Sequence, residues 1–211
     1  MNNSPNAEAV GRRINSCIKE LARSDFESAL LHYAPAINNT ASRRRPNAGT
    51  GDAIRRFIAD QEWLITEYAF KASMTGWVVG KLTFPEAIYN LVRNPLAHEG
   101  ELDARIKFVD TQQMNLSDSL WEVPNQYIGG LVLAVVAATE NAGVTAMNGQ
   151  GTVKLMGRDW IFNDLWGEED TLRELLENKH ANNRRHIPKR SGDSYRRYKE
   201  RPDPFKYPRG G

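Results

Sequence analysis

The chain has 211 residues, of which 40% are hydrophobic, and its 28 Lys/Arg and 26 Asp/Glu side chains leave a net charge of +2. This length suits one domain with a hydrophobic core, and the single cysteine, Cys17, excludes an internal disulfide and favours a reducing compartment. The longest apolar run, Tyr127–Ala138, is shorter than the roughly 20 residues that a membrane helix needs. Because the first residues are polar and lack the apolar segment of a signal peptide, we expect a cytoplasmic protein that does not bind membranes.

The charge is divided unevenly along the chain. Residues 178–211 carry 11 Lys/Arg and 3 Asp/Glu, a net charge of +8, whereas residues 1–177 carry 17 and 23, a net charge of −6. We therefore expect a folded domain over residues 1–177 and a basic, disordered tail over 178–211. The same composition fits a tail that binds RNA, one that only keeps the protein soluble, or one that folds over the acidic domain. The candidate RNA contacts, which alternate with aromatic residues, are Arg184, Arg185, Lys189, Arg190, Arg196 and Arg197.

The first half of the chain contains two predicted helices. Apolar residues recur at helical spacing over Ala7–Leu31, and we expect the turn at Pro35 to end this helix. A loop containing Arg43–Arg45 follows, and these cations either add to a phosphate-binding surface or are simply solvated. The second helix is expected over Thr50–Ser73, with a capping residue at its start.

The second half combines helices with short strands, so the chain as a whole is predicted to be a mainly α bundle with a short C-terminal β-hairpin. Pro85 suits the first turn of the helix that precedes the polar motif described next. The expected elements are a helix from Phe84, a strand over Ala104–Val109, a buried helix over Pro124–Ala138, a hairpin over Thr152–Phe162 and a helix over Glu168–Glu177.

One segment, Leu91–Glu99, places the three candidate catalytic residues Arg93, Asn94 and His98 within six residues. Arginine can hold a phosphate group bidentately, and histidine can exchange a proton near neutral pH. On an unbroken helix, Arg93 and His98 would point about 140° apart. Pro95 cannot donate a helical hydrogen bond, so we expect a bend or a restart with Asn94 as N-cap, which could bring both side chains to one surface.

The same residues have a purely structural interpretation, which the spacing alone favours. An Arg and an Asn before a proline often close one helix and cap the next. A single histidine in a helix is more often a surface or core residue than a catalyst. The four histidines of the chain are scattered without a ligand pattern, and no glycine-rich phosphate loop is present, so we expect no metal and no cofactor.

The segment LVRNPLAHEG, which begins at Leu91, resembles the core motif of HEPN-domain proteins, in which an arginine, a polar residue and a histidine follow one another. The resemblance is specific over about Phe84–Gly100 and extends weakly to the apolar segment after Pro124. It does not cover the first helix or the basic tail. It implies an up-and-down helical bundle that forms a homodimer, with two copies of the motif facing each other in one composite cleft.

The resemblance also implies a function, that of a metal-independent endoribonuclease. His98 would act on the ribose 2′-hydroxyl as a base or protonate the leaving 5′-oxygen, Arg93 would hold the scissile phosphate, and Asn94 would orient either group. Many HEPN proteins act as toxins or phage-defence effectors, so an antitoxin or inhibitory partner is expected as well as RNA. Two alternatives stay open: an inactive HEPN-like module for binding or dimerisation, and an RNA-binding protein that acts through its tail.

Overall fold

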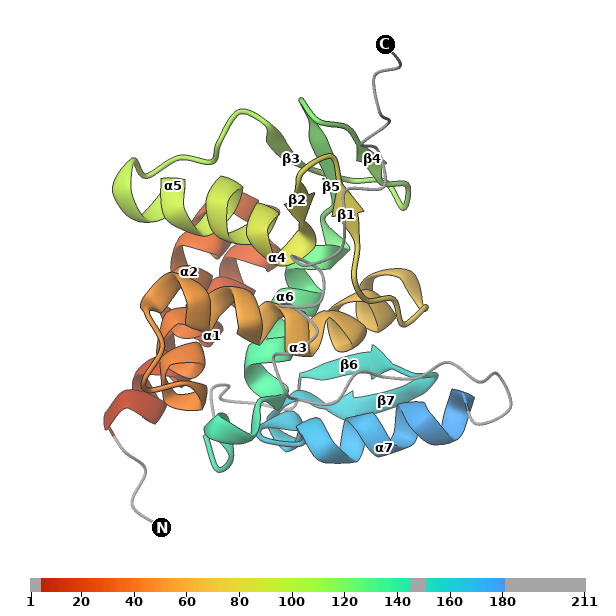
Figure 1. Ribbon diagram of the computed structural model, residues 1–211. Helices are drawn as coiled ribbons and strands as arrows, with labels where there is room; N and C mark the ends of the chain where they lie inside the picture. The colour runs from red at the N-terminus through yellow and green to blue at the C-terminus, as the bar shows by residue number, and fades with distance from the viewer. Residues whose placement is uncertain (1–4, 145–150, 181–211) are drawn as a thin grey trace.

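The computed structural model describes residues 5–144 and 151–180, and this part of the protein is mainly α-helical (Figure 1). The long helices α1, α2 and α3 come first, the apolar helix α6 packs against α3, and α7 ends the described chain. The Arg-Asn-His motif lies on a continuous helical stretch that comes between α3 and α6 along the chain. The bounds are α1 Pro5–Ala22, α2 Phe26–Arg44, α3 Thr50–Phe70, α4 Phe84–Ala87, the π-helix η1 Ile88–Arg93, α5 Asn94–His98, α6 Gln126–Ala137, the short η2 Thr139–Asn141 and η3 Phe162–Leu165, and α7 Glu169–His180.

The single helix predicted over Ala7–Leu31 is wrong, because the chain divides into α1 and α2. The break lies at Ser24, whose φ of 61° is left-handed and cannot continue a right-handed helix. Asp25 then caps α2 by accepting a hydrogen bond from the N–H of Ser28 at 3.0 Å. Pro35 lies inside α2 and does not end it. The proline removes one helical hydrogen bond, and the buried face of α2, which packs against α1, holds the helix together on both sides of it.

Helix α3 is buried on nearly all sides. Every side chain from Phe57 to Glu67 is buried, whereas a helix at the surface of a protein buries only one stripe. Helix α2, the motif stretch and α6 all pack against it. The carboxyl groups of Asp60, Glu62 and Glu67 therefore lie inside the protein, where each needs a compensating partner.

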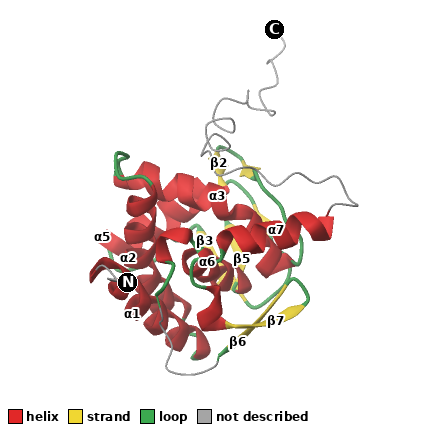
Figure 2. Ribbon diagram, turned by 90° about the horizontal axis from the view of Figure 1, so that it is seen from below, coloured by secondary structure: helices red, strands yellow, loops and turns green. Residues whose placement is uncertain are grey.

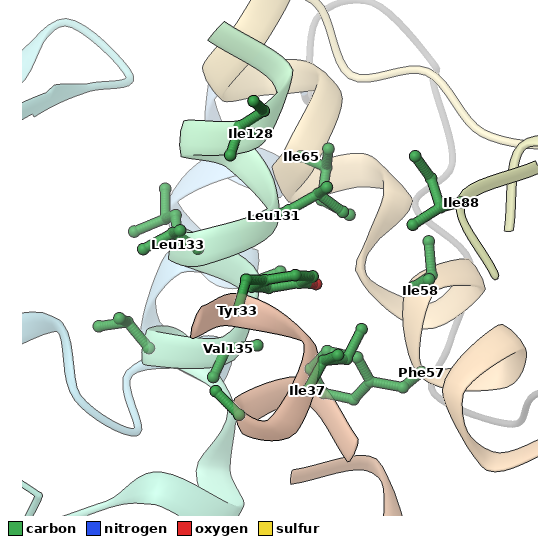
Figure 3. Packing of buried hydrophobic residues seen from close by; sticks show 14 of the residues in the cluster. Tyr33, Ile37, Phe57, Ile58, Ile65, Ile88, Ile128, Leu131, Leu133 and Val135 are labelled. Carbon is green, nitrogen blue, oxygen red and sulfur yellow. The ribbon is translucent and has the colours of Figure 1, made fainter. Parts of the chain in front are cut away.

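Helix α6 confirms the predicted buried helix, although it begins at Gln126, because Pro124 belongs to the strand before it. In the view of Figure 2, α6 lies at the centre of the molecule, with the other helices and the strands around it. Gly130 lets α6 approach α3 closely, since a Cβ atom there would lie 2.6 Å from the carbonyl oxygen of Ile65. Figure 3 shows the core that results, with Tyr33 of α2 among side chains of α3 and α6.

The strands of the described residues form three small sheets. The hairpin predicted over Thr152–Phe162 is confirmed as β6 and β7, with positive φ at Met156 and Gly157 in its turn. The strand predicted over Ala104–Val109 is confirmed as β3, which pairs in parallel with β5, while β4 pairs antiparallel with β5. The bounds are β1 Val78–Val79, β2 Leu82–Thr83, β3 Ile106–Val109, β4 Asn115–Leu116, β5 Trp121–Pro124, β6 Thr152–Leu155 and β7 Arg158–Ile161.

The arginines at the end of α2 do not form the solvated loop or phosphate-binding surface considered for Arg43–Arg45. The side chain of Arg44 is only 7% exposed, donates to both carboxylate oxygens of Glu140 at 3.0 and 2.7 Å, and pairs with Glu169. Local sequence could not predict these contacts, because their partners lie far along the chain. The arginine–carboxylate cluster, as we call it, joins α2, α3, η2 and α7 and consists of Arg44, Arg45, Asp60, Glu140, Glu169 and Arg173.

The last described helix, α7, continues past the boundary predicted at residue 177, as far as His180. The basic tail predicted over residues 178–211 therefore overlaps the end of α7, and the rest of it lies outside the described residues. Within the part of the chain that the structure describes, no helix is both long and apolar enough to cross a membrane.

Candidate functional site

The motif lies on the helical stretch formed by α4, η1 and α5, which packs against α3 through α4 and η1 and against α2 through η1 and α5 (Figure 1). Thr83 starts this stretch with a capping box. Its hydroxyl accepts a hydrogen bond from the N–H of Glu86 at 3.3 Å, and its own N–H donates to the Glu86 carboxylate at 3.0 Å. Pro85 occupies the first turn, as predicted, where the missing N–H leaves no helical hydrogen bond unmade.

The restart predicted at Pro95 is wrong, and so is the N-cap role of Asn94, because the chain stays helical through both residues. Asn94 is helical, with φ −71° and ψ −47°, and no side chain caps the start of α5. The helix widens there instead, because the N–H of Asn94 donates to the carbonyl of Tyr89, five residues back. The carbonyl of Leu91, which a proline cannot satisfy, accepts a hydrogen bond from the N–H of Asp103 at 3.1 Å. A π-turn and a donor from the following loop thus accommodate the proline without a break.

Arg93 ends η1 and lies beside Tyr89, one turn earlier on the same stretch. Its guanidinium carbon lies 5.8 Å from the centre of the Tyr89 ring, and that of Arg55 from α3 lies 4.7 Å from the same ring. These are cation–π distances, so one ring orients two guanidinium groups. Gly51 of α3 makes room for this arrangement, since a Cβ atom there would lie 2.8 Å from the Tyr89 hydroxyl. We call Arg55, Tyr89 and Arg93 the Arg–Tyr–Arg cluster.

The two arginines of this cluster have unused hydrogen-bond donors. The Nε atoms of Arg55 and Arg93 are buried without a hydrogen-bond partner, and neither side chain pairs with a carboxylate among the described residues. The nearby Asp52 is engaged by Arg56, with a nitrogen–oxygen distance of 2.9 Å. Buried donors nearly always have partners, and two like charges oriented by one ring repel each other unless an anion joins them. Two guanidinium groups at one ring, with no carboxylate to neutralise them among the described residues, favour the binding of an anion.

The other two motif residues lie beyond this cluster along the stretch. Asn94 is half-buried, whereas His98 is exposed at the carboxyl end of α5. Among the described residues, no hydrogen bond or ring contact joins His98 to Arg93. The structure thus brings Arg93 together with Tyr89 and Arg55, and it does not bring Arg93 and His98 together within one chain.

Sequence reasoning missed two residues of the cluster. Tyr89 precedes Arg93 by four residues, the spacing at which side chains on a helix meet, so this pair carried a usable signal. Arg55 lies on a different helix, and no local pattern links it to the motif.

The six arginines and lysines predicted to contact RNA, from Arg184 to Arg197, lie outside the described residues. Within those residues, no group of three or more His, Cys, Asp or Glu side chains is placed to hold a metal ion.

Comparison with known proteins places the chain in a family. The family model named Rv1289 matches residues 9–189, from the first turns of α1 past the end of α7, and so includes the whole motif. No curated protein and no solved structure matches the chain. The resemblance to HEPN proteins finds no support in these comparisons and stays a prediction. Because the match extends over far more than half of its length, the chain belongs to the Rv1289 family.

Proposed function

We propose that this protein is a metal-independent endoribonuclease whose phosphate-binding group is the Arg–Tyr–Arg cluster. The observation that carries the proposal is that Arg55 and Arg93 hold two guanidinium groups at one tyrosine ring, and that neither pairs with a carboxylate among the described residues. Arg93 is also the arginine of the HEPN-like motif. A motif that serves only to build a helix would give no reason to hold two cations together without a carboxylate.

The cluster supplies binding and charge stabilisation. A guanidinium group offers two parallel N–H donors, so Arg55 and Arg93 together can contact both non-bridging oxygens of a phosphodiester. Negative charge grows on these oxygens as a fifth oxygen approaches phosphorus, and fixed cations stabilise this charge most when they need not reorient. The Tyr89 ring provides that fixed orientation.

His98 supplies proton transfer. The imidazole takes the proton of the ribose 2′-hydroxyl, the 2′-oxygen bonds to phosphorus, and the bond from phosphorus to the 5′-oxygen breaks as that oxygen gains a proton from water. The products are a 2′,3′-cyclic phosphate and a 5′-hydroxyl end. Asn94, which lies next to Arg93, orients the phosphate or the imidazole. Because side chains provide both charge and proton transfer, the reaction requires no metal.

A homodimer would complete the site. His98 is exposed and lies apart from Arg93 on its own chain, so the imidazole that serves one cluster would come from a second copy. Two such sites related by a two-fold axis would share one cleft. RNA is thus the proposed partner and substrate, and a role as a toxin or phage-defence effector, held in check by an antitoxin, is part of the same proposal.

The test is cleavage of mixed RNA in EDTA by the full chain and its variants. We expect wild-type protein to release fragments with 2′,3′-cyclic phosphate ends, His98→Ala to lose at least 100-fold in rate, and Arg93→Ala and Arg55→Ala to lose rate and bind RNA more weakly. Arg12→Ala, which alters an arginine paired with Glu8 at the surface, is the matched control and should cleave normally.

Three results would contradict the proposal. Cleavage that survives His98→Ala would remove the histidine from the reaction, and a strictly monomeric active protein in sedimentation would remove the composite site. RNA binding without cleavage, unaffected by Arg55→Ala and Arg93→Ala but abolished by deleting residues 181–211, would assign the function to the tail. Binding that depends on both arginines without any cleavage would identify an inactive module.

A further inference from the structure

A second site lies at the opposite end of α3 from the Arg–Tyr–Arg cluster, where two neighbouring pockets share Tyr68 as a wall. At about 1.5 Å per residue, Tyr68 is roughly 20 Å along the helix axis from Arg55. Both pockets are also lined by strand β6, which lies beneath the C-terminal half of α3 in Figure 1. We call the two pockets together the Tyr68 cleft.

The larger pocket, of about 370 Å³, is polar and cationic. Lys71 and Lys154 line it, both exposed, and no carboxylate does so among the described residues. Lys71 lies at the end of α3, where its Nζ donates to the carbonyl of Tyr68 at 2.9 Å. Gln126 opens α6, and its side-chain oxygen is buried without a hydrogen-bond partner. Because two lysines line this pocket and no side chain caps the start of α6, the pocket favours an anion.

The smaller pocket, of about 210 Å³, is apolar. Its walls come from α1, α3, α6, β6 and the residue that follows β7, and Tyr68 and Thr152 bring hydroxyl groups to it. Gly129 of α6 shapes this pocket, because a Cβ atom there would lie 2.6 Å from the Tyr68 ring and displace it. The apolar side chains that line it are Ile18, Leu21, Val132, Leu133, Val153 and Phe162.

We infer that the Tyr68 cleft binds a small amphiphilic anion, with a carboxylate or phosphate head in the polar pocket and a hydrocarbon body in the apolar one. The lysines and the uncapped end of α6 match a negatively charged head group. The aliphatic walls match a hydrocarbon better than a nucleobase, whose ring nitrogens and oxygens would lose their hydrogen bonds to water there. The polar pocket alone reaches the size that is typical of small-molecule sites. This site does not depend on the proposed ribonuclease function.

The test is calorimetric titration of the full chain with decanoate and with decyl phosphate, each below its micelle concentration. We expect at least one of the two anions to bind at a single saturable site, and decanol and butyrate to bind at least tenfold more weakly. The double variant Lys71→Gln and Lys154→Gln should weaken anion binding at least tenfold. The double variant Lys81→Gln and Lys107→Gln, which removes two exposed lysines elsewhere, should bind like wild type.

The probes also distinguish the source of the head group. Binding of decyl phosphate alone would identify a phosphate-headed ligand, and binding of decanoate alone would identify a fatty acid. Absence of saturable binding, uptake of several molecules per chain, or equal affinity in the Lys71→Gln, Lys154→Gln variant would overturn the inference. Tighter binding of adenosine monophosphate than of either amphiphile would also overturn it, in favour of a nucleotide site.

Discussion

Glu62 shows how α3 accommodates a carboxyl group in the core. It is 1% exposed, and its Oε2 atom accepts a hydrogen bond from the N–H of Gly76 at 2.7 Å. Burial nevertheless raises the pKa of Glu62 from 4.5 to about 7, because two backbone donors compensate only part of the hydration that the charged form loses. The folded protein therefore binds this proton more tightly than the unfolded chain does.

The first prediction concerns the pH dependence of stability. The folded-state pKa of Glu62 lies above the unfolded value, so its contribution is complete below about pH 4.5 and is lost as the pH rises through about 7. At 1.36 kcal/mol per pKa unit, the loss is about 3 kcal/mol. Urea unfolding from pH 4.5 to 8 should show this decline in the wild type and less of it in Glu62→Gln. If the two proteins lost stability in parallel as the pH rises, the pKa of Glu62 would be the same in the folded and unfolded states, which would contradict the prediction.

The second prediction concerns Cys17, a fully buried residue of α1. Burial raises the pKa of its thiol to about 12, so almost no thiolate is present at pH 8 in the folded state. We expect no reaction with a disulfide reagent at pH 8 in buffer and complete reaction in urea. Rapid labelling of the native protein would mean that α1 opens away from the core on the timescale of the assay.

The candidate site also shows what single residues can and cannot indicate. The motif pointed to Arg93 as the phosphate ligand, and its contact with Tyr89 follows from helical spacing. Arg55 could not be found in this way, because it meets Tyr89 only after two separate helices pack together. Conversely, the sequence predicted that Arg44 is an exposed cation. In the structure its side chain is buried and pairs with Glu140 and Glu169, which lie far along the chain.

At the scale of elements, the packing of α6 on α3 depends on Gly130. The third prediction is that Gly130→Ala destabilises the protein by about 1–3 kcal/mol, because the new Cβ atom would lie 2.6 Å from the backbone carbonyl of Ile65, which cannot move aside alone. Thermal unfolding measures the loss. Gly49→Ala is the control for the added volume, since nothing lies within 4 Å of a Cβ atom there and the residue has no positive φ, and it should lose only the fraction of about 1 kcal/mol that alanine costs at the N-cap of α3. An equal change in both variants would contradict the close approach of the helices.

Helix existence was easier to predict than helix boundaries, and the reason differs from element to element. The buried helix α6 and the hairpin β6–β7 follow from an apolar run and a glycine turn, which are local signals. The division between α1 and α2 depends on the left-handed Ser24, a residue that rarely adopts this conformation. The continuous helical passage through Pro95 depends on the N–H of Asp103, which a later loop supplies.

At the scale of the molecule, the arginine–carboxylate cluster connects α7 to the helical body. Glu169 of α7 is fully buried between Arg44 of α2 and Arg173 of its own helix. The fourth prediction is that Glu169→Gln lowers the free energy of unfolding by about 3 kcal/mol, because buried cations then lose a compensating charge. Urea unfolding measures this change.

The control for this prediction is an exposed ion pair that is also formed by an arginine and a glutamate. Glu8 and Arg12 lie 3.8 Å apart with side chains 62% and 71% exposed, so Glu8→Gln should change stability by less than about 0.5 kcal/mol. If the two variants lost similar stability, the buried cluster would contribute no more than a solvated ion pair.

The sequence by itself determined that this protein is mainly α-helical, which apolar run forms its buried helix, where the C-terminal hairpin lies and which residues form its polar motif. These properties depend on periodicity, turn chemistry and residue type, all of which act over a few neighbouring residues. Only the tertiary structure decided which charges are buried, that Arg55 joins Arg93 at Tyr89, and that His98 stays apart from them. Such outcomes depend on contacts between helices, because burial and pairing arise when segments far apart in the chain pack against each other.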